Sequence, residues 1–154
     1  MKGVSPWFNP YVGALVNRAD ALLAPDWVGS MSAFARWDHI TTDGVTYKYT
    51  GYDKVSAAAA KAHKPWALMV ILGSQGSGLP GHVLSGVPAK EWIETDGERF
   101  PVFWSPKANA FLQSTLAKLA ARYSADPWLA QVRVIGFWSI NGEPWFAGGD
   151  SGKP

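Results

Sequence analysis

Glu143 is the residue whose surroundings most clearly suggest chemistry. It stands in Asn141-Gly142-Glu143-Pro144-Trp145, directly after an apolar run, residues 132–140, that predicts a buried strand. Pro144 stiffens the turn, and Trp138 and Trp145 should partly desolvate the carboxyl group. Such desolvation raises the pKa of a carboxyl group, as a general acid requires. From these residues alone, a carboxylate that caps a backbone turn fits equally well.

Two other predicted strand ends carry polar groups. Arg36-Trp37-Asp38-His39 follows one strand and Gly73-Ser74-Gln75 follows another. Asp38 could act as a second carboxylate, although an Asp that caps a turn is the commoner case. Arg36 could contact a substrate or form a structural ion pair. We therefore include Arg36, Asp38 and Gln75 among the candidate substrate-binding residues.

Tryptophan is unusually frequent, with nine in 154 residues. A buried indole needs a partner for its N–H, whereas an exposed one offers a flat face on which a sugar ring can stack. Position relative to the predicted strand ends divides eight of the nine into two groups. The stacking candidates are Trp37, Trp104, Trp138 and Trp145, and those expected to serve in packing are Trp7, Trp27, Trp66 and Trp128.

Several classes of function are disfavoured. There is no cysteine and no His/Asp/Glu spacing typical of a metal site, so we expect no metal and no cofactor. The glycines of residues 73–78 have the wrong spacing for a nucleotide-binding loop, and no GxSxG elbow exists. A net charge of +2 and the absence of a long apolar run argue against nucleic-acid and membrane partners. Residues 1–20 lack the pattern of a signal peptide, and an extracellular location stays open.

The elements that must position these residues alternate along the chain. Strands are predicted at 30–37, 66–72 and 132–140, with a further one possible at 3–8. Helices are predicted at 14–24, 52–63 and 107–123, and residues 73–106 form a long excursion that we expect to be functional. This alternation implies parallel strands with right-handed crossovers, in either a doubly wound sheet or a barrel. A complete barrel needs about 250 residues and eight strands. We therefore predict an α/β fold in which residues 1–154 form a single domain, a partial (β/α)8 TIM-type barrel of about the first three or four βα units.

Several segments resemble one family of enzymes. They are Phe34-Ala35-Arg36-Trp37-Asp38, Lys64-Pro65-Trp66-Ala67-Leu68, Pro101-Val102-Phe103-Trp104 and Gly136-Phe137-Trp138-Ser139-Ile140-Asn141-Gly142-Glu143-Pro144. Together, over about residues 27–145, they resemble the N-terminal half of retaining glycoside hydrolases with (β/α)8 barrels. These form the clan of the family-five cellulases and mannanases and the family-forty-two β-galactosidases.

The resemblance implies a role for each matching residue. Glu143 corresponds to the acid/base, Asn141 to the residue that holds the sugar 2-hydroxyl, and Arg36 to the arginine that steadies the nucleophile. The family places Asn directly before Glu, whereas Gly142 intervenes here. The nucleophile, a second glutamate near the seventh strand, would lie outside this chain, and a retaining mechanism needs both carboxyl groups about 5 Å apart.

The leading hypothesis is therefore a fragment of a glycoside hydrolase-like barrel that hydrolyses O-glycosidic bonds of β-linked saccharides. The alternative is a non-catalytic carbohydrate-binding or structural barrel module that uses the same aromatic residues. The expected partners are a carbohydrate and either the remainder of the barrel or a second copy of the chain, because half a barrel exposes strand edges.

Overall fold

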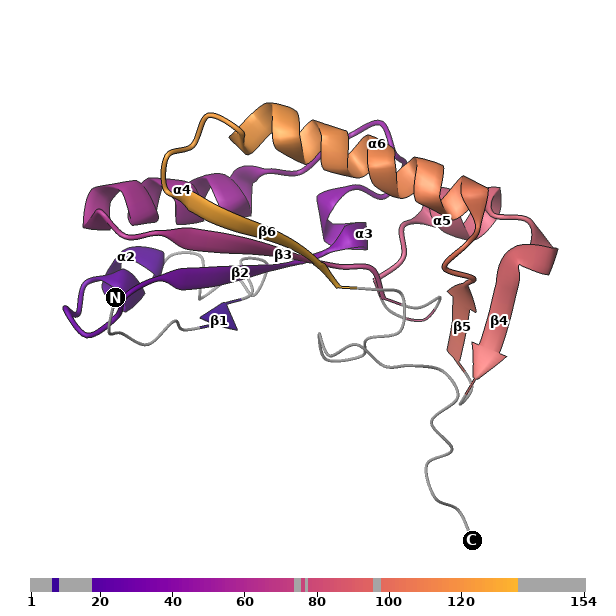
Figure 1. Ribbon diagram of the computed structural model, residues 1–154, viewed down its shortest axis with the longest axis horizontal. Helices are drawn as coiled ribbons and strands as arrows, with labels where there is room; N and C mark the ends of the chain where they lie inside the picture. The colour runs from indigo at the N-terminus through magenta and orange to yellow at the C-terminus, as the bar shows by residue number, and fades with distance from the viewer. Residues whose placement is uncertain (1–6, 9–17, 74–75, 77, 96–97, 136–154) are drawn as a thin grey trace, which may run out of the picture.

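A computed structural model of the chain describes residues 7–8, 18–73, 76, 78–95 and 98–135 (Figure 1). Its main sheet has four parallel strands in the order β1-β2-β3-β6, which is also their order along the chain. A doubly wound sheet reverses its strand order partway across, whereas successive barrel strands are neighbours. The order therefore favours the barrel. The strands are β1 (Trp7–Phe8), β2 (Met31–Arg36), β3 (Trp66–Ile71) and β6 (Leu129–Ile135).

All four predicted strands are present, including the short one near the start of the chain. β6 begins at Leu129, earlier than the apolar run suggested, because Leu129 already pairs with Trp66 of β3. The predicted end of this strand, at residue 140, lies outside the described residues.

The two longest helices match their predictions. α4 (Thr50–Ala62) is followed by its C-cap residue His63, which adopts a left-handed conformation two residues before Pro65. α6 (Pro106–Tyr123) begins with a proline, and the hydroxyl of its N-cap residue, Ser105, accepts a hydrogen bond from the Ala108 N–H. The shorter helices are α2 (Ala19–Leu23), α3 (Trp37–Ile40) and α5 (Gly81–Gly86). No helix of the described chain is long and apolar enough to cross a bilayer.

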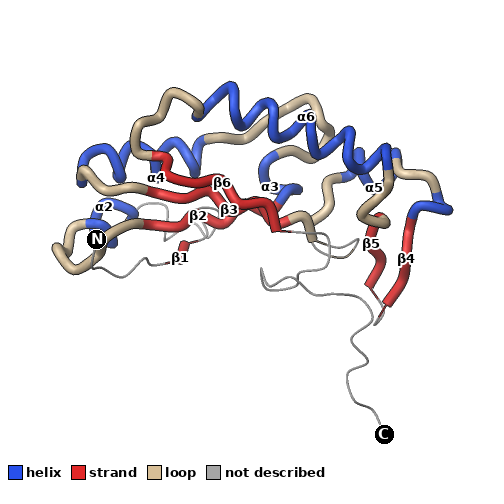
Figure 2. Tube along the Cα trace, in the orientation of Figure 1, coloured by secondary structure: helices blue, strands red, loops and turns tan. Residues whose placement is uncertain are grey.

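The two long helices, α4 and α6, lie along one side of the sheet, and the core fills the space between them and the strands (Figures 1 and 2). Side chains alternate along each strand, so every second residue faces the helices. Trp66, Leu68 and Val70 of β3 do so and are fully buried. The Trp66 ring meets the edge of Tyr123 from α6, with ring centroids 5.6 Å apart.

The excursion after β3 is more ordered than a loop. Besides α5 it contains a 3₁₀ turn (Ala89–Glu91) and an antiparallel hairpin of β4 (Trp92–Thr95) and β5 (Glu98–Pro101). The dipeptide Asp96-Gly97 between two partly apolar runs is a strong hairpin signal that the sequence analysis overlooked. The Trp92 indole donates to the Val87 carbonyl and stacks under the Arg99 guanidinium.

Asp126 joins the amino ends of β3 and β6. Its carboxylate accepts hydrogen bonds from the Trp66 indole (2.9 Å), the Ser56 hydroxyl (2.7 Å) and the Trp128 N–H (2.8 Å). Burial raises the pKa of Asp126, but these donors together outweigh it and leave the pKa below its ordinary value. Asp126 is therefore a structural carboxylate.

Candidate functional site

The carboxyl edge of the parallel sheet carries the candidate site. Arg36 at the end of β2 is in register with Ile71 at the end of β3, and Ile71 is in register with Ile135, the last residue of β6. Parallel strands all end at the same edge, and barrel enzymes place their functional groups there. Residues that follow these three strand ends are thus the ones to examine.

Arg36 and Asp38 form the best-defined polar pair at this edge. The guanidinium donates from Nε to Asp38 Oδ1 (3.0 Å) and from Nη2 to Asp38 Oδ2 (2.6 Å). Both side chains are partly exposed, at 35% and 24%. A bidentate contact holds the planar guanidinium in one orientation. Asp38 thus orients Arg36, and this ion pair is the arrangement that the structural interpretation of Arg36 predicted.

His39 borders the same pair. Its Nε2 atom lies 3.9 Å from Asp38 Oδ1. Burial lowers the pKa of His39 and outweighs the Asp38 carboxylate, which raises it. The imidazole is therefore neutral at neutral pH.

The glycine-rich segment after β3 approaches the end of β2. The Asp38 N–H donates to the Gly78 carbonyl at 2.9 Å. Gly73 and Gly78 both have positive φ, and a Cβ atom on Gly78 would lie 3.1 Å from the Gly73 Cα atom. These two glycines therefore serve close backbone packing. Gln75, the predicted substrate-binding residue of this segment, lies outside the described residues.

Trp37 corrects one expectation, because the structure places it in the core. It is fully buried, and its indole N–H donates to the hydroxyl of the buried Thr115 on α6 at 2.9 Å. The ring also meets His82 edge-on, with centroids 6.2 Å apart. Trp37 begins α3, so its side chain turns toward the helix layer. With no exposed face, the indole cannot serve as a stacking platform in this conformation.

Trp104 has the opposite environment. It is 62% exposed, precedes α6, and meets the edge of the neighbouring Phe103, which is 65% exposed, with centroids 4.5 Å apart. The Asn109 amide of α6 donates to the Phe103 carbonyl, and this hydrogen bond holds residues 103 and 104 against the start of the helix. Two exposed aromatic rings held against each other are available for contact with a ligand.

Among the tryptophans expected to serve in packing, the outcome is mixed. Trp66 is fully buried as predicted, and the half-buried Trp128 packs against the core. Trp27 is 65% exposed, because it stands in the connection between α2 and β2 and only one of its neighbours, Val28, reaches the core. The Trp7 side chain lies outside the described residues.

The remaining predicted residues follow β6 and lie outside the described part of the chain. They are Trp138, Asn141, Glu143 and Trp145. The structure therefore brings together Arg36 and Asp38, and it separates the buried Trp37 from the exposed Trp104.

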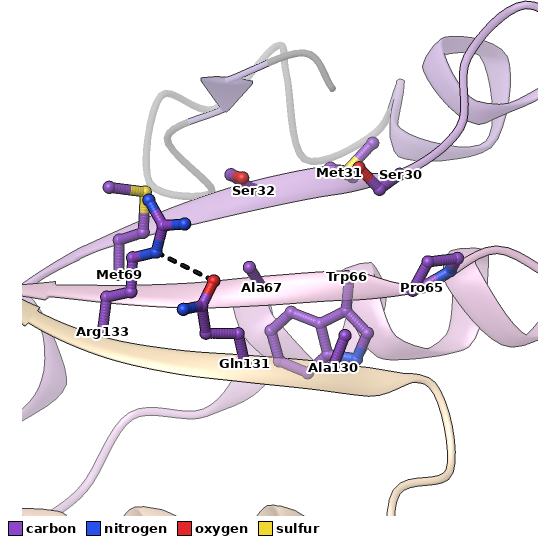
Figure 3. Close-up of a pocket in the computed structure, with 10 residues that line it drawn as sticks. All are labelled: Ser30, Met31, Ser32, Pro65, Trp66, Ala67, Met69, Ala130, Gln131 and Arg133. Atoms are coloured by element: carbon purple, nitrogen blue, oxygen red, sulfur yellow. Dashed lines mark hydrogen bonds between the residues drawn. The ribbon is translucent and has the colours of Figure 1, made fainter. Parts of the chain in front are cut away.

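A further group of polar residues, not predicted from the sequence, lies on the sheet face that is turned away from the helices. Gln131 and Arg133 of β6 lie there beside Ala67 and Met69 of β3 (Figure 3). The Arg133 Nε atom donates to Gln131 Oε1 at 2.8 Å. With Ser32 of β2 they line an open concavity of about 400 Å³. The signal was the alternation of Gln131 and Arg133 with Val132 and Val134 in the printed sequence.

Comparison with known proteins identifies the fold. No family model and no curated protein matches the sequence. The catalytic domain of β-amylase from Paenibacillus polymyxa superposes with a TM-score of 0.57 at 10% identity, over 86% of this chain and 38% of that domain. A GH5_18 protein from Streptomyces cattleya in complex with GlcNAc gives a TM-score of 0.46 at 13% identity, over 89% of this chain and 33% of that one. The chain thus spans well under half the length of either neighbour.

The fold is therefore that of a partial parallel α/β barrel, similar to part of the β-amylase catalytic domain. Its four parallel strands in chain order correspond to part of such a barrel.

Proposed function

We propose that this chain is the N-terminal part of a glycoside hydrolase barrel that hydrolyses O-glycosidic bonds of β-linked saccharides, with Glu143 as general acid/base. The supporting observation is the place of β6, the fourth parallel strand in chain order, whose sequence continues into Asn141-Gly142-Glu143-Pro144. Catalytic groups of barrel enzymes follow the carboxyl ends of strands. The barrel-type fold and this segment together favour a hydrolase of this class.

Arg36 has a supporting role in this proposal. Its guanidinium is held by Asp38 at the carboxyl end of β2, on the same sheet edge at which β6 ends. There it can stabilise the carboxylate of a nucleophile supplied by the strands that complete the barrel. Asp38 is already engaged by Arg36, so it is a poor candidate for the nucleophile itself.

Recognition of the saccharide is assigned to aromatic and amide groups. Trp104 is the described tryptophan with an exposed face that best suits stacking on a sugar ring. Asn141, Gln75, Trp138 and Trp145 are proposed as further contacts. The sugar and its linkage would be selected by these groups and by those of the completing strands.

The test is Glu143→Gln in the completed enzyme, with Glu94→Gln as the matched control, because Glu94 is an exposed residue of the hairpin. On natural β-linked gluco-, manno- and galacto-oligosaccharides we expect kcat to fall about 10²- to 10⁴-fold while binding persists, since protonation of the leaving group is lost. An aryl glycoside whose leaving group needs no protonation should be cleaved by the variant far better than the natural substrates are.

Unchanged turnover of the natural oligosaccharides by Glu143→Gln would overturn the assignment. If the unmodified protein binds these oligosaccharides but hydrolyses none of them, the non-catalytic binding module is the correct alternative. The exposed pair Phe103 and Trp104 is the feature that favours that second function.

A further inference from the structure

The inner face of the sheet, defined as the face turned away from the helices, carries a cation with no anionic partner in the described chain. Residues in register on neighbouring parallel strands share a face, so Ser32, Ala67 and Gln131 form one row and Phe34, Met69 and Arg133 the next. Arg36, Ile71 and Ile135 form the row at the carboxyl edge. None of these nine positions is acidic.

Arg133 is exposed, and its Nε atom donates a hydrogen bond to the neutral Gln131. Arg36, the other cation of the inner face, is already paired with Asp38. Figure 3 shows Arg133 extended across Met69 in the open concavity rather than toward a strand edge. The unpaired positive charge is therefore located on the inner surface itself.

Closing a barrel changes the environment of this charge. The interior of an eight-stranded barrel is just wide enough to be filled by side chains, so Arg133 would lose its water. An arginine removed from water must be paired with an anion, because an isolated buried charge is very costly. Whatever closes this barrel must therefore bring a carboxylate to the level of Arg133.

Within the described residues, β6 is also incompletely covered on its other face. Val132 and Val134 point toward the helix side, in register with the buried Leu68 and Val70, yet they are 46% and 42% exposed. The next βα unit of a barrel would cover these valines with its helix and pair with the open edge of β6. Both faces of β6 thus favour a further βα unit as its neighbour.

We propose that the inner face is the docking surface for a complementary, non-identical set of parallel βα units that places an Asp or Glu opposite Arg133. A second copy of this chain is the poorer occupant. In a two-fold assembly the two Arg133 side chains would enter one interior at the same height, and the described inner face offers no free carboxylate to separate them. The inference rests on the partial-barrel fold and does not depend on the proposed hydrolysis.

The test uses the chain itself, with Arg133→Glu as a probe that carries the required carboxylate at the same height. We mix the unmodified chain with Arg133→Glu and measure mass by light scattering after size-exclusion chromatography. The mixture should form a heterodimer at least about tenfold tighter than either chain alone forms a dimer, since close interfacial charge pairs couple strongly. Raising the salt concentration should change the heterodimer affinity little, because the ion pair between Arg133 and the introduced Glu is then buried.

Lys118→Glu is the matched control, because Lys118 is an exposed residue of α6 and its reversal changes the net charge equally. A second measurement locates the contact. The chain contains no cysteine, so Ala67→Cys introduces one thiol on the inner face. Its labelling by a maleimide should slow at least about tenfold in the Arg133→Glu mixture and stay unchanged with Lys118→Glu.

Three results would overturn the proposal. The first is a stable dimer of the unmodified chain in which Ala67→Cys is protected, which would make a second copy the occupant. The second is a mixture that stays monomeric although circular dichroism shows both chains folded. The third is that the unmodified chain associates with Lys118→Glu as tightly as with Arg133→Glu. That result would mean that net charge rather than the inner face drives the contact.

Discussion

β3 and β6 are paired neighbours in one sheet, yet they lie in different environments. Val70 of β3 and Val134 of β6 are in direct register and face the same helix layer, but Val70 is fully buried and Val134 is 42% exposed. Among the described residues, β3 has a strand on each side, whereas β6 has one on a single side. Apolar residue type therefore does not fix burial; the number of neighbouring elements does. The valines of β6 indicate contacts that the described chain does not supply.

Three experiments test this contrast between the two strands, and the largest effect is expected in β3. Trp66→Ala removes a fully buried indole, its hydrogen bond to Asp126 and its contact with Tyr123. We expect the free energy of unfolding, measured by urea titration, to fall by about 3–5 kcal/mol. Trp27→Ala, at a 65% exposed site, should change it by less than about 0.5 kcal/mol. A small effect at Trp66 would mean that β3 is less tightly packed than its burial indicates.

The registered valines give the most direct comparison. Val70→Ala should lower the free energy of unfolding by about 2 kcal/mol, because it removes two buried carbon atoms and leaves a cavity. Val134→Ala should cost no more than about 0.5 kcal/mol in the chain alone. Both values come from the same denaturant titration. Equal losses would show that Val134 is covered in solution, for example by a second molecule, and the contrast between the strands would then disappear.

Asp126→Asn probes the residue that ties the two strands together at their amino ends. Near neutral pH we expect a loss of about 1 kcal/mol, because hydrogen bonds to a charged acceptor become bonds to a neutral one. The folded-state pKa of Asp126 is below its ordinary value, so its contribution is fully present above the unfolded pKa of about 3.9 and is lost as pH falls through the folded pKa. The difference in stability between the two proteins should therefore shrink below about pH 4. A difference that stays constant from neutral pH into that range would assign the effect to packing.

Much of the local structure could be predicted from the sequence. The strand predicted at 66–72 corresponds to β3, and the helix predicted at 107–123 corresponds to α6. Local patterns suffice for such elements, because hydrophobic periodicity reflects which faces are covered. The hairpin of β4 and β5 was not predicted, although the dipeptide Asp96-Gly97 is typical of a hairpin turn. For the site, Arg36 and Asp38 were predicted at a strand end and are found there as a bidentate pair. Their role in binding a substrate stays a prediction.

Two of the predicted stacking tryptophans lie in the described chain, and they show why residue type could not predict exposure. Trp37 and Trp104 had equal standing as stacking candidates, since both were placed near strand ends or loops. Only the fold decided between them, by providing Thr115 and His82 around Trp37 and no comparable cover for Trp104. Side-chain exposure depends on elements distant in the sequence, so residue type alone could not separate them.

The sequence by itself determined the alternation of strands and helices, and with it a parallel sheet, because hydrophobic periodicity and helix-end signals act over a few residues. The sequence also singled out Glu143 by its neighbours. Only the tertiary structure decided the strand order that distinguishes a barrel from a doubly wound sheet and the burial of Trp37. It alone also placed Arg133 on an open inner face. These depend on contacts between residues far apart in the chain, whose energies no local pattern encodes.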